Sequence, residues 1–249
     1  MSLLELNRIG HAFFGRTVLE GITLGVARQE IVALVGPSGS GKSTLAHIAA
    51  GLVEPREGRI ARRYLRHAMV FQEPRLMPWA TAAGNIGFPL RLSRAPRRMR
   101  RRMIADAALR AGLLPEDLGK YPSELSGGMR QRAAIARALV TDPDFIYFDE
   151  PFTALDVALK RRMQDLVIEA AASARFAALF ITHDLLEAIR ISHRILVLDA
   201  GGRGIAGERL PAGSPGTRDE AAIFALRQHY LTADPLFAHI HDIDERLRP

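Results

Sequence analysis

The sequence has no cysteine among its 249 residues. Without thiols it cannot form disulfides, hold zinc on thiolates or use a cysteine nucleophile, so thiol redox chemistry is excluded. Lysine is scarce as well, because only Lys42, Lys120 and Lys160 occur, and arginine supplies nearly all the cations behind the formal net charge of +7. A basic balance indicates non-specific attraction to anionic partners such as nucleic acid or a membrane, and says little about the fold.

Long hydrophobic runs are also missing. The longest uncharged stretch, residues 76–90, is broken by Pro78, Gly84 and Pro89, and it is too short and too interrupted to cross a bilayer as a helix. The segment Met1–Glu5 lacks a basic region followed by an apolar one, so no secretory signal is expected. We therefore expect any work at a membrane to go through partners. The length suffices for one α/β domain with a subdomain.

A glycine-rich loop is the strongest positive signal. Residues 36–44 satisfy the pattern G-x-x-x-x-G-K-[S/T], and they lie between the apolar run 31–35 and the helix-compatible stretch 45–50. This order predicts a strand, a phosphate-binding loop and a helix, rather than a loop that merely connects the two elements. Glycines let backbone N–H groups turn toward a polyphosphate, and the helix N-terminus adds positive potential. The residues expected to hold a nucleoside triphosphate are Gly36, Pro37, Ser38, Gly39, Ser40, Gly41, Lys42, Ser43 and Thr44.

Two of these side chains have expected roles of their own. Lys42 is placed to reach the β- and γ-phosphates, and Ser43 to offer its hydroxyl to Mg²⁺.

Polar side chains follow three predicted buried strands, at residues 67–71, 145–148 and 177–182. The carboxyl ends of parallel strands meet at one edge of a sheet, which is where such sheets hold ligands. Gln72 follows the first strand, Asp149 and Glu150 the second, and His183 the third. Asp149 is placed to organise Mg²⁺ through water, and Glu150 to orient or polarise an attacking water. A strand cap, helix caps and a structural histidine are the ordinary alternatives, but the phosphate loop upstream favours catalytic roles for the two acids.

The rest of the chain predicts the frame of this site. We expect an antiparallel sheet over 3–35, a strand entered near 57–60, helices between 103 and 139, a helix over 155–174, a strand over 195–199, a linker at 211–216, and one or two helices within 219–249. His239 and His241 stand two apart in that tail, where helical geometry would make them diverge rather than share a metal.

Seven arginines lie between residues 91 and 102: Arg91, Arg94, Arg97, Arg98, Arg100, Arg101 and Arg102. They can contact phosphates of lipid or nucleic acid, or form a solvated helix face. The absence of interleaved aromatic residues favours the solvated face.

The stretch Leu125–Arg132 reads Leu-Ser-Gly-Gly-Met-Arg-Gln-Arg. It resembles the signature of the ATP-binding subunits of ABC transporters, LSGG followed by a Q-x-R-type helix. The resemblance extends over residues 3–204 and rests on the order of six elements. The matches are the Walker A loop at 36–44, the Q-loop at Gln72, the signature at 125–132, the Walker B end at Asp149 and Glu150, the D-loop at Thr153–Asp156 and the switch histidine at His183.

The resemblance implies the architecture. The expected fold class is α/β, a P-loop NTPase (RecA-like) core with an antiparallel β subdomain and an α-helical signature subdomain. The implied ATPase domain spans 1–210, with the core and β subdomain at about 1–85 and 140–210 and the helical subdomain at about 86–139. A linker and a helical tail at 211–249 would follow, too short for the regulatory barrel of some sugar importers.

The resemblance also implies the chemistry. Two copies of the chain would sandwich two ATP molecules head to tail, with Mg²⁺ held through Ser43, Gln72 and Asp149. In each site Ser126, Gly127 and Gly128, at a helix N-terminus, would close on the γ-phosphate bound by Lys42 of the other copy. Glu150 would polarise water, His183 would contact the γ-phosphate, Gln72 would sense Mg²⁺ and the attacking water, and Asp156 would communicate across the dimer. Phe14 falls where the family keeps an adenine-stacking aromatic, which outweighs a core role for this residue.

The implied partners are transmembrane permease subunits and, indirectly, a solute-binding protein. The implied location is cytoplasmic, at the inner face of the membrane. The segment Gln72–Trp79 is similar to the stretch after the Q-loop in importers of nitrate, sulfonates and taurine, where it would line the groove that receives the permease. Met129 and Glu150–Phe152 fit the same group. The sequence departs from the family in a short stretch between Lys42 and Gln72 and in His193, where an Asp is common.

Two other functions are compatible with parts of the sequence. A soluble ABC-type ATPase acting on nucleic acid or ribosomes is encouraged by the charge of +7, but such proteins usually carry a coiled-coil insertion, zinc cysteines or two cassettes. A nucleotide-binding scaffold without turnover is disfavoured because Lys42, Asp149, Glu150 and His183 are all present.

Overall fold

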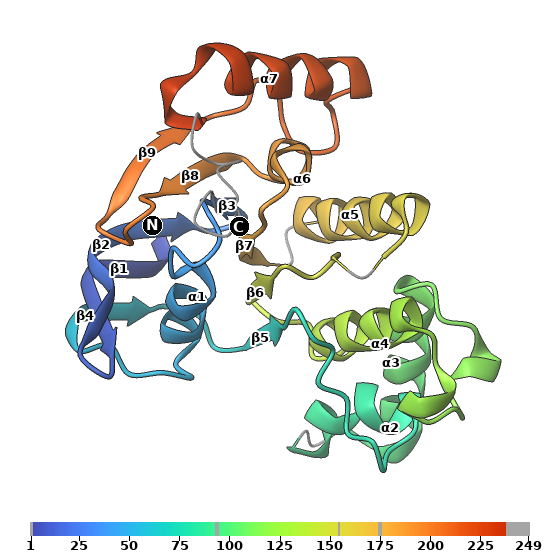
Figure 1. The fold of residues 1–249 in the computed structure, drawn as a ribbon. Helices are drawn as coiled ribbons and strands as arrows, with labels where there is room; N and C mark the ends of the chain where they lie inside the picture. The colour runs from blue at the N-terminus through green and yellow to red at the C-terminus, as the bar shows by residue number, and fades with distance from the viewer. Residues whose placement is uncertain (1, 93–94, 154, 174–175, 238–249) are drawn as a thin grey trace, which may run out of the picture.

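The computed structural model describes residues 2–92, 95–153, 155–173 and 176–237. A six-stranded sheet in the order β5-β6-β7-β3-β8-β9 forms its centre (Figure 1). Neighbouring strands run parallel except for β8 and β9, which are antiparallel. The strands are β3 (Ile31–Val35), β5 (His67–Val70), β6 (Phe145–Asp149), β7 (Ala177–Ile181), β8 (Arg194–Leu198) and β9 (Ile205–Arg209). The expected α/β class is therefore confirmed.

The three central strands β6, β7 and β3 are buried along their whole length. This follows from their continuous apolar sequence, because a parallel strand covered on both faces has no solvent side. Side chains alternate between the faces: Val32 and Leu34 pack with α1 (Lys42–Ala50), while Ala33 and Val35 pack with α6 (Leu185–Ile191). Helix α5 (Val157–Ala172) contributes Met163 and Val167 to a cluster with β6 and β7. Helices therefore cover both faces of the sheet.

A second, three-stranded antiparallel sheet covers the other side of α1 (Figure 1). Its order is β2-β1-β4, with β1 (Ser2–Phe13), β2 (Arg16–Ala27) and β4 (Glu57–Arg62). Phe14 and Gly15 join β1 to β2 and both have positive φ, 48° and 81°, as a tight two-residue hairpin turn requires. The antiparallel sheet expected near the N-terminus is thus present.

Helices α2 (Ala82–Ile86), α3 (Arg97–Arg110) and α4 (Gly127–Leu139) form a separate group at the end of the molecule away from α7 (Figure 1). They share their own apolar cluster, which includes Ile86, Ala107 and Ala136. Short 3-10 helices at Phe88–Leu92, Pro115–Asp117 and Pro122–Glu124 connect them. The last two begin at prolines because proline's fixed φ suits a first helical position.

The chain after β9 is tied to the core. Arg218 is buried, and its guanidinium donates to backbone carbonyls of two segments. These are Ile189 and Ser192 at the end of α6, and Pro211, Ala212 and Gly213 after β9. Helix α7 (Glu220–Ala233) then packs on α6, with Tyr230 stacked on Phe237 of the last 3-10 helix, Pro235–Phe237. The stretch 211–216, expected to be a linker, is thus held to the end of α6 through Arg218, although most of its residues are exposed. His239 and His241 lie outside the described residues, as does Arg94.

No helix within the described ranges is both long enough and apolar enough to span a membrane.

Candidate nucleotide site

The phosphate loop, residues 36–41, connects β3 to α1 as predicted. Gly41 precedes the first helical residue with φ 94°, and no side chain caps this helix. A Cβ at Gly41 would lie 2.8 Å from a methyl carbon of Leu19 and 3.1 Å from one of Val18. Glycine is needed here for conformation and for space. The first N–H groups of α1 have no partner within the helix, so they present positive potential to the loop.

Lys42 lies buried in this loop. Its Nζ donates to the carbonyl oxygens of Gly36 at 2.8 Å and Pro37 at 2.7 Å. Burial lowers the pKa of Lys42, and the nearby charges of Glu150 and Asp149 oppose that shift. Close by, the hydroxyl of Ser40 is buried without a hydrogen-bond partner among the described residues. A buried cation held by carbonyls, beside an unpaired donor, fits a site that accepts phosphate oxygens.

Ser43 and Asp149 meet although 106 positions separate them in the sequence. The Ser43 hydroxyl donates to Asp149 Oδ1 at 2.8 Å, and His47 Nε2 lies 3.5 Å from Asp149 Oδ2. Asp149 is buried at the carboxyl end of β6. Hydroxyl and carboxylate oxygens are ligands that Mg²⁺ accepts in small number, with phosphate and water oxygens completing its shell. The pair therefore fits Mg²⁺, although the described residues contain no group of three or more metal-binding His, Asp or Glu side chains.

Glu150 and His183 are brought together as well. His183 Nδ1 lies 2.9 Å from Glu150 Oε2, at the exits of β6 and β7. The backbone of Glu150 has φ 45°, a conformation that costs energy for a residue with a side chain. It is held by its N–H, which donates to the carbonyl of Ile181 at 3.0 Å, and by the hydroxyl of Thr153, which donates to its carbonyl at 3.0 Å. With this backbone conformation, the Glu150 carboxylate lies within hydrogen-bond distance of His183.

The signature residues lie at the start of α4. Ser126 is its N-cap, and the hydroxyl oxygen accepts from the N–H of Met129 at 3.2 Å. A Cβ at Gly128 would lie 3.3 Å from Leu159 of α5, so the glycine permits close packing of the two helices. Among the described residues, no hydrogen bond or ion pair links Ser126, Gly127 or Gly128 to the phosphate loop. Within the described part of one copy, the N-terminus of α4 is therefore not joined by such contacts to the phosphate loop before α1.

Gln72 follows β5 and is exposed. The backbone on either side of it accepts hydrogen bonds from side chains of α4. The buried Gln131 donates to the carbonyl of Phe71 at 3.3 Å. Arg137 donates to the carbonyls of Pro74 at 2.8 Å and Arg75 at 2.9 Å. Sequence reasoning did not single out Arg137, because nothing in the sequence distinguishes it from thirty other arginines without the fold.

The remaining predicted positions lie on turns. Phe14 is fully exposed at the hairpin turn, while the half-exposed Phe13 packs edge-on against His11 with ring centroids 4.6 Å apart. Asp156 is the N-cap of α5 and accepts from the N–H of Leu159 at 2.9 Å. Ala154, within the predicted D-loop, lies outside the described residues.

Lys160 forms an ionic clamp that sequence reasoning missed. Its Nζ lies 2.8 Å from Asp184 Oδ2 and 2.5 Å from the buried Glu187 Oε1. The hydroxyl of Thr182 donates to the other Glu187 oxygen at 2.6 Å. Burial alone would lower the pKa of Lys160, but the hydrogen bonds to Asp184 and Glu187 raise it overall. The clamp joins α5, one turn after Asp156, to the segment that carries His183.

Together these features define a nucleotide-binding ATPase of the phosphate-loop class. Residues 19–153 match the family model described as ABC transporter. The chain is 42% identical to the aliphatic sulfonates import ATP-binding protein SsuB 1 of Pseudomonas syringae pv. syringae, over 93% of this chain and 95% of that protein. It is 40% identical to the protein of the same name from Nocardia farcinica, over 91% of this chain and 90% of the relative.

Solved structures agree. A dimeric bacterial ABC transporter cassette superposes with a TM-score of 0.79 at 29% identity, over 84% of this chain and 99% of that one. A dimeric ATP-binding cassette in a post-hydrolysis state bound to ADP and Pi gives a TM-score of 0.76 at 28% identity and the same coverage. The chain belongs to the ABC transporter family and is an ATP-binding ATPase of that family.

Proposed function

We propose that this chain energises an ABC importer by binding and hydrolysing ATP in a head-to-tail dimer. The observation that carries the proposal is the geometry of the two anion sites. Lys42, Ser43, Asp149, Glu150 and His183 gather near the phosphate loop. Among the described residues, no hydrogen bond or ion pair links the signature at the start of α4 to this loop. A second copy would complete both sites.

Each residue has a role in this site. Lys42 and the loop N–H groups bind the phosphates of ATP. Ser43 and Asp149, with Gln72, would hold Mg²⁺, which when bound neutralises phosphate charge. Glu150 orients and polarises the attacking water, and His183 holds that carboxylate in place and contacts the γ-phosphate. Phe14 stacks on the adenine, and Asp156 contacts the other copy.

A groove beside the Q-loop supports a permease partner. It encloses about 420 Å³ and is lined by Met69, Phe71, Arg75, Phe88 and others. Aromatic and aliphatic side chains with few charges form a surface suited to an amphipathic helix. We propose that a cytoplasmic helix of the permease enters this groove, which would place the protein at the inner face of the membrane.

We further propose that the subdomains divide as the sequence suggests. The core and β subdomain would comprise about 1–85 and 140–210, and the helical subdomain about 86–139. The separate apolar cluster of α2, α3 and α4 supports this division. The closing of the dimer on ATP and its reopening after hydrolysis would then move the helical subdomain and the docked permease.

The cargo is proposed as an aliphatic sulfonate or a similar small anion such as taurine or nitrate. Two lines support it: the names of the similar import proteins and the Gln72–Trp79 segment. A nucleic-acid-directed ATPase has only the net charge in its favour.

The test is transport in cells. A strain lacking the gene is complemented with the wild type or with Glu150→Gln, and uptake of labelled ethanesulfonate, taurine and nitrate is measured. We expect the wild type alone to restore uptake of a sulfonate. Restoration by both versions would contradict the ATPase role, and unchanged uptake of all three solutes in the deletion strain would contradict the cargo.

A further inference from the structure

Helix α3 begins with a cluster of exposed arginines. Arg97, Arg98, Arg101 and Arg102 are exposed, and we call these four residues the α3 arginine patch. Within the described part of the chain, the patch makes one ion pair, between Arg102 Nε and Asp106 Oδ2 at 3.7 Å, where both side chains are well exposed. The patch therefore presents nearly all of its charge to the surroundings.

The positive charge of the patch lowers the stability of α3. Pro96 is the N-cap and offers no side-chain hydrogen bond, and no acidic residue occurs in the first turn. Cations near a helix N-terminus are unfavourable because the helix dipole is positive there. Arginines three and four positions apart, such as Arg98 with Arg101 and Arg102, also repel one another. The described residues offset little of this charge, and departures from such local rules are expected at functional sites.

The patch occupies the first turns of α3. The helix is anchored farther along, because Ala107 and Ala108 are buried in the cluster shared with α2 and α4. Exposed apolar side chains occur in the same stretch of chain: Met99 on α3 itself and Phe88 on the preceding 3-10 helix, where the guanidinium of Arg91 lies 5.3 Å from the ring centroid. Cations beside exposed apolar groups on an anchored helix are typical of a surface that meets lipid headgroups.

We propose that the α3 arginine patch binds the phosphates of anionic phospholipids at the membrane surface. Clusters of four or more basic side chains on a helix face attract such lipids. The permease is a poorer match, since cytoplasmic loops of membrane proteins are themselves rich in Lys and Arg. Nucleic acid is also a poorer match, because no aromatic side chain alternates with the patch arginines for base stacking.

The position of the patch agrees with this partner. Phe88, on the 3-10 helix that precedes α3 in the chain, lines the groove proposed for the permease, and α2 and α3 lie at the end of the molecule away from α7 (Figure 1). This step rests on the proposed function: if the permease docks there, the same end faces the bilayer. The charge and exposure of the patch do not depend on it.

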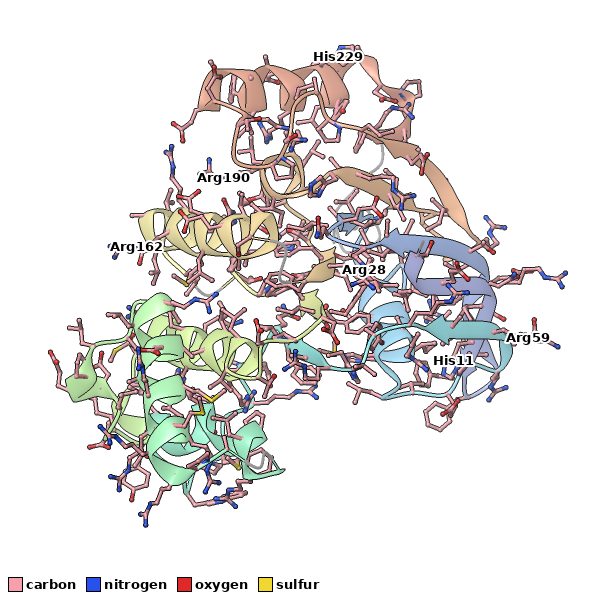
Figure 2. The ribbon with its side chains drawn as sticks, turned by 180° about the vertical axis from the view of Figure 1, so that it is seen from behind. His11, Arg28, Arg59, Arg162, Arg190 and His229 are labelled. Atoms are coloured by element: carbon pink, nitrogen blue, oxygen red, sulfur yellow. The ribbon has the colours of Figure 1, made fainter. Side chains whose placement is uncertain are left out.

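The experiment is co-sedimentation of the full chain with vesicles of phosphatidylcholine, with and without phosphatidylglycerol, at about 0.15 M salt. The patch variant replaces all four arginines by Gln (R97Q, R98Q, R101Q and R102Q). The matched control makes the same change at four exposed arginines of the β1–β4 sheet region (R8Q, R28Q, R56Q and R59Q). Figure 2 shows Arg59 at the edge of the molecule opposite the green helices that include α3. Both variants lose four positive charges, so a difference in their vesicle binding shows that the position of the arginines matters.

We expect the wild type and the control to bind only vesicles that contain phosphatidylglycerol, and the patch variant to bind these at least about tenfold more weakly. Equal vesicle binding by the patch variant and the control variant would overturn the proposal. So would equal binding of the wild type to vesicles with and without phosphatidylglycerol. Salt-sensitive binding to duplex DNA at about 0.15 M salt, lost in the patch variant while its vesicle binding stays unchanged, would assign the patch to nucleic acid instead. ATP hydrolysis by all three proteins is measured in parallel without lipid. Absent hydrolysis would count against the proposed function, while the vesicle result would still decide the patch.

Discussion

Lys42 shows how much of the site depends on single side chains. Its ammonium bridges two carbonyls of the phosphate loop, and an ATP phosphate can replace them as its partner. We expect Lys42→Ala to weaken ATP binding at least about 100-fold, since charge-assisted hydrogen bonds contribute about 1.5–3 kcal/mol each. Equilibrium titration with a fluorescent ATP analogue measures this. Lys120→Ala is the control, because Lys120 pairs with Asp117 in the helical part. Unchanged affinity in Lys42→Ala would refute the role.

The aromatic residue that meets adenine is a second question at this scale. Phe14 is fully exposed at the turn, and the ring of its neighbour Phe13 packs edge-on against His11. We expect Phe14→Ala to weaken ATP binding about 5- to 100-fold, because base stacking on an aromatic ring contributes about 1–3 kcal/mol, while the affinity for inorganic triphosphate stays constant. Phe13→Ala is the matched variant. If only Phe13→Ala weakens ATP binding, the stacking role belongs to Phe13.

Between elements, the Lys160 clamp is the contact whose role is easiest to isolate. It joins α5 to the segment bearing His183, so we expect it to set the position of the histidine relative to Glu150. Lys160→Met should lower kcat about tenfold or more, because small misplacements of catalytic groups are costly, and should leave KM for ATP within about twofold because the phosphate loop is untouched. Steady-state ATPase kinetics measure both.

Two variants separate positioning from general damage to α5. Lys160→Arg keeps the charge and should recover most of kcat. Arg161→Met removes the neighbouring cation, which pairs with Glu220 of α7, and should leave kcat unchanged. Equal losses in Lys160→Met and Arg161→Met would show that the clamp has only a structural role.

For the whole molecule, the expected behaviour is ATP-driven dimerisation. Glu150→Gln removes the negative charge that polarises water but preserves shape, so it should bind ATP and stop before hydrolysis. Gel filtration with ATP and Mg²⁺ should then give a stable dimer, while wild type under the same conditions hydrolyses its ATP and elutes mainly as monomer. Adding Lys42→Ala to Glu150→Gln should abolish the dimer. A monomer for Glu150→Gln at saturating ATP would count against the sandwich.

The sequence by itself determined the elements and the chemistry at their ends. The strands at 31–35, 67–71, 145–148, 177–182 and 195–199 agree with β3, β5, β6, β7 and β8 to within one residue at each end. These strands were predictable because each is a continuous apolar run bounded by turn residues, a pattern that neighbouring positions of the sequence show directly. The placement of Gln72, Asp149 and His183 after such strands followed from the same local pattern.

Only the tertiary structure decided which distant side chains meet. The pairing of Ser43 with Asp149, the Lys160 clamp, the hold of Arg137 on the Q-loop and the burial of Arg218 join segments far apart in the chain. Arg218 holds the expected linker to the end of α6, and the positive φ of Glu150 is held by hydrogen bonds to Ile181 and Thr153. The reason is physical: local periodicity selects helices and strands, whereas partners for buried charges are selected by packing, which one linear pattern does not encode.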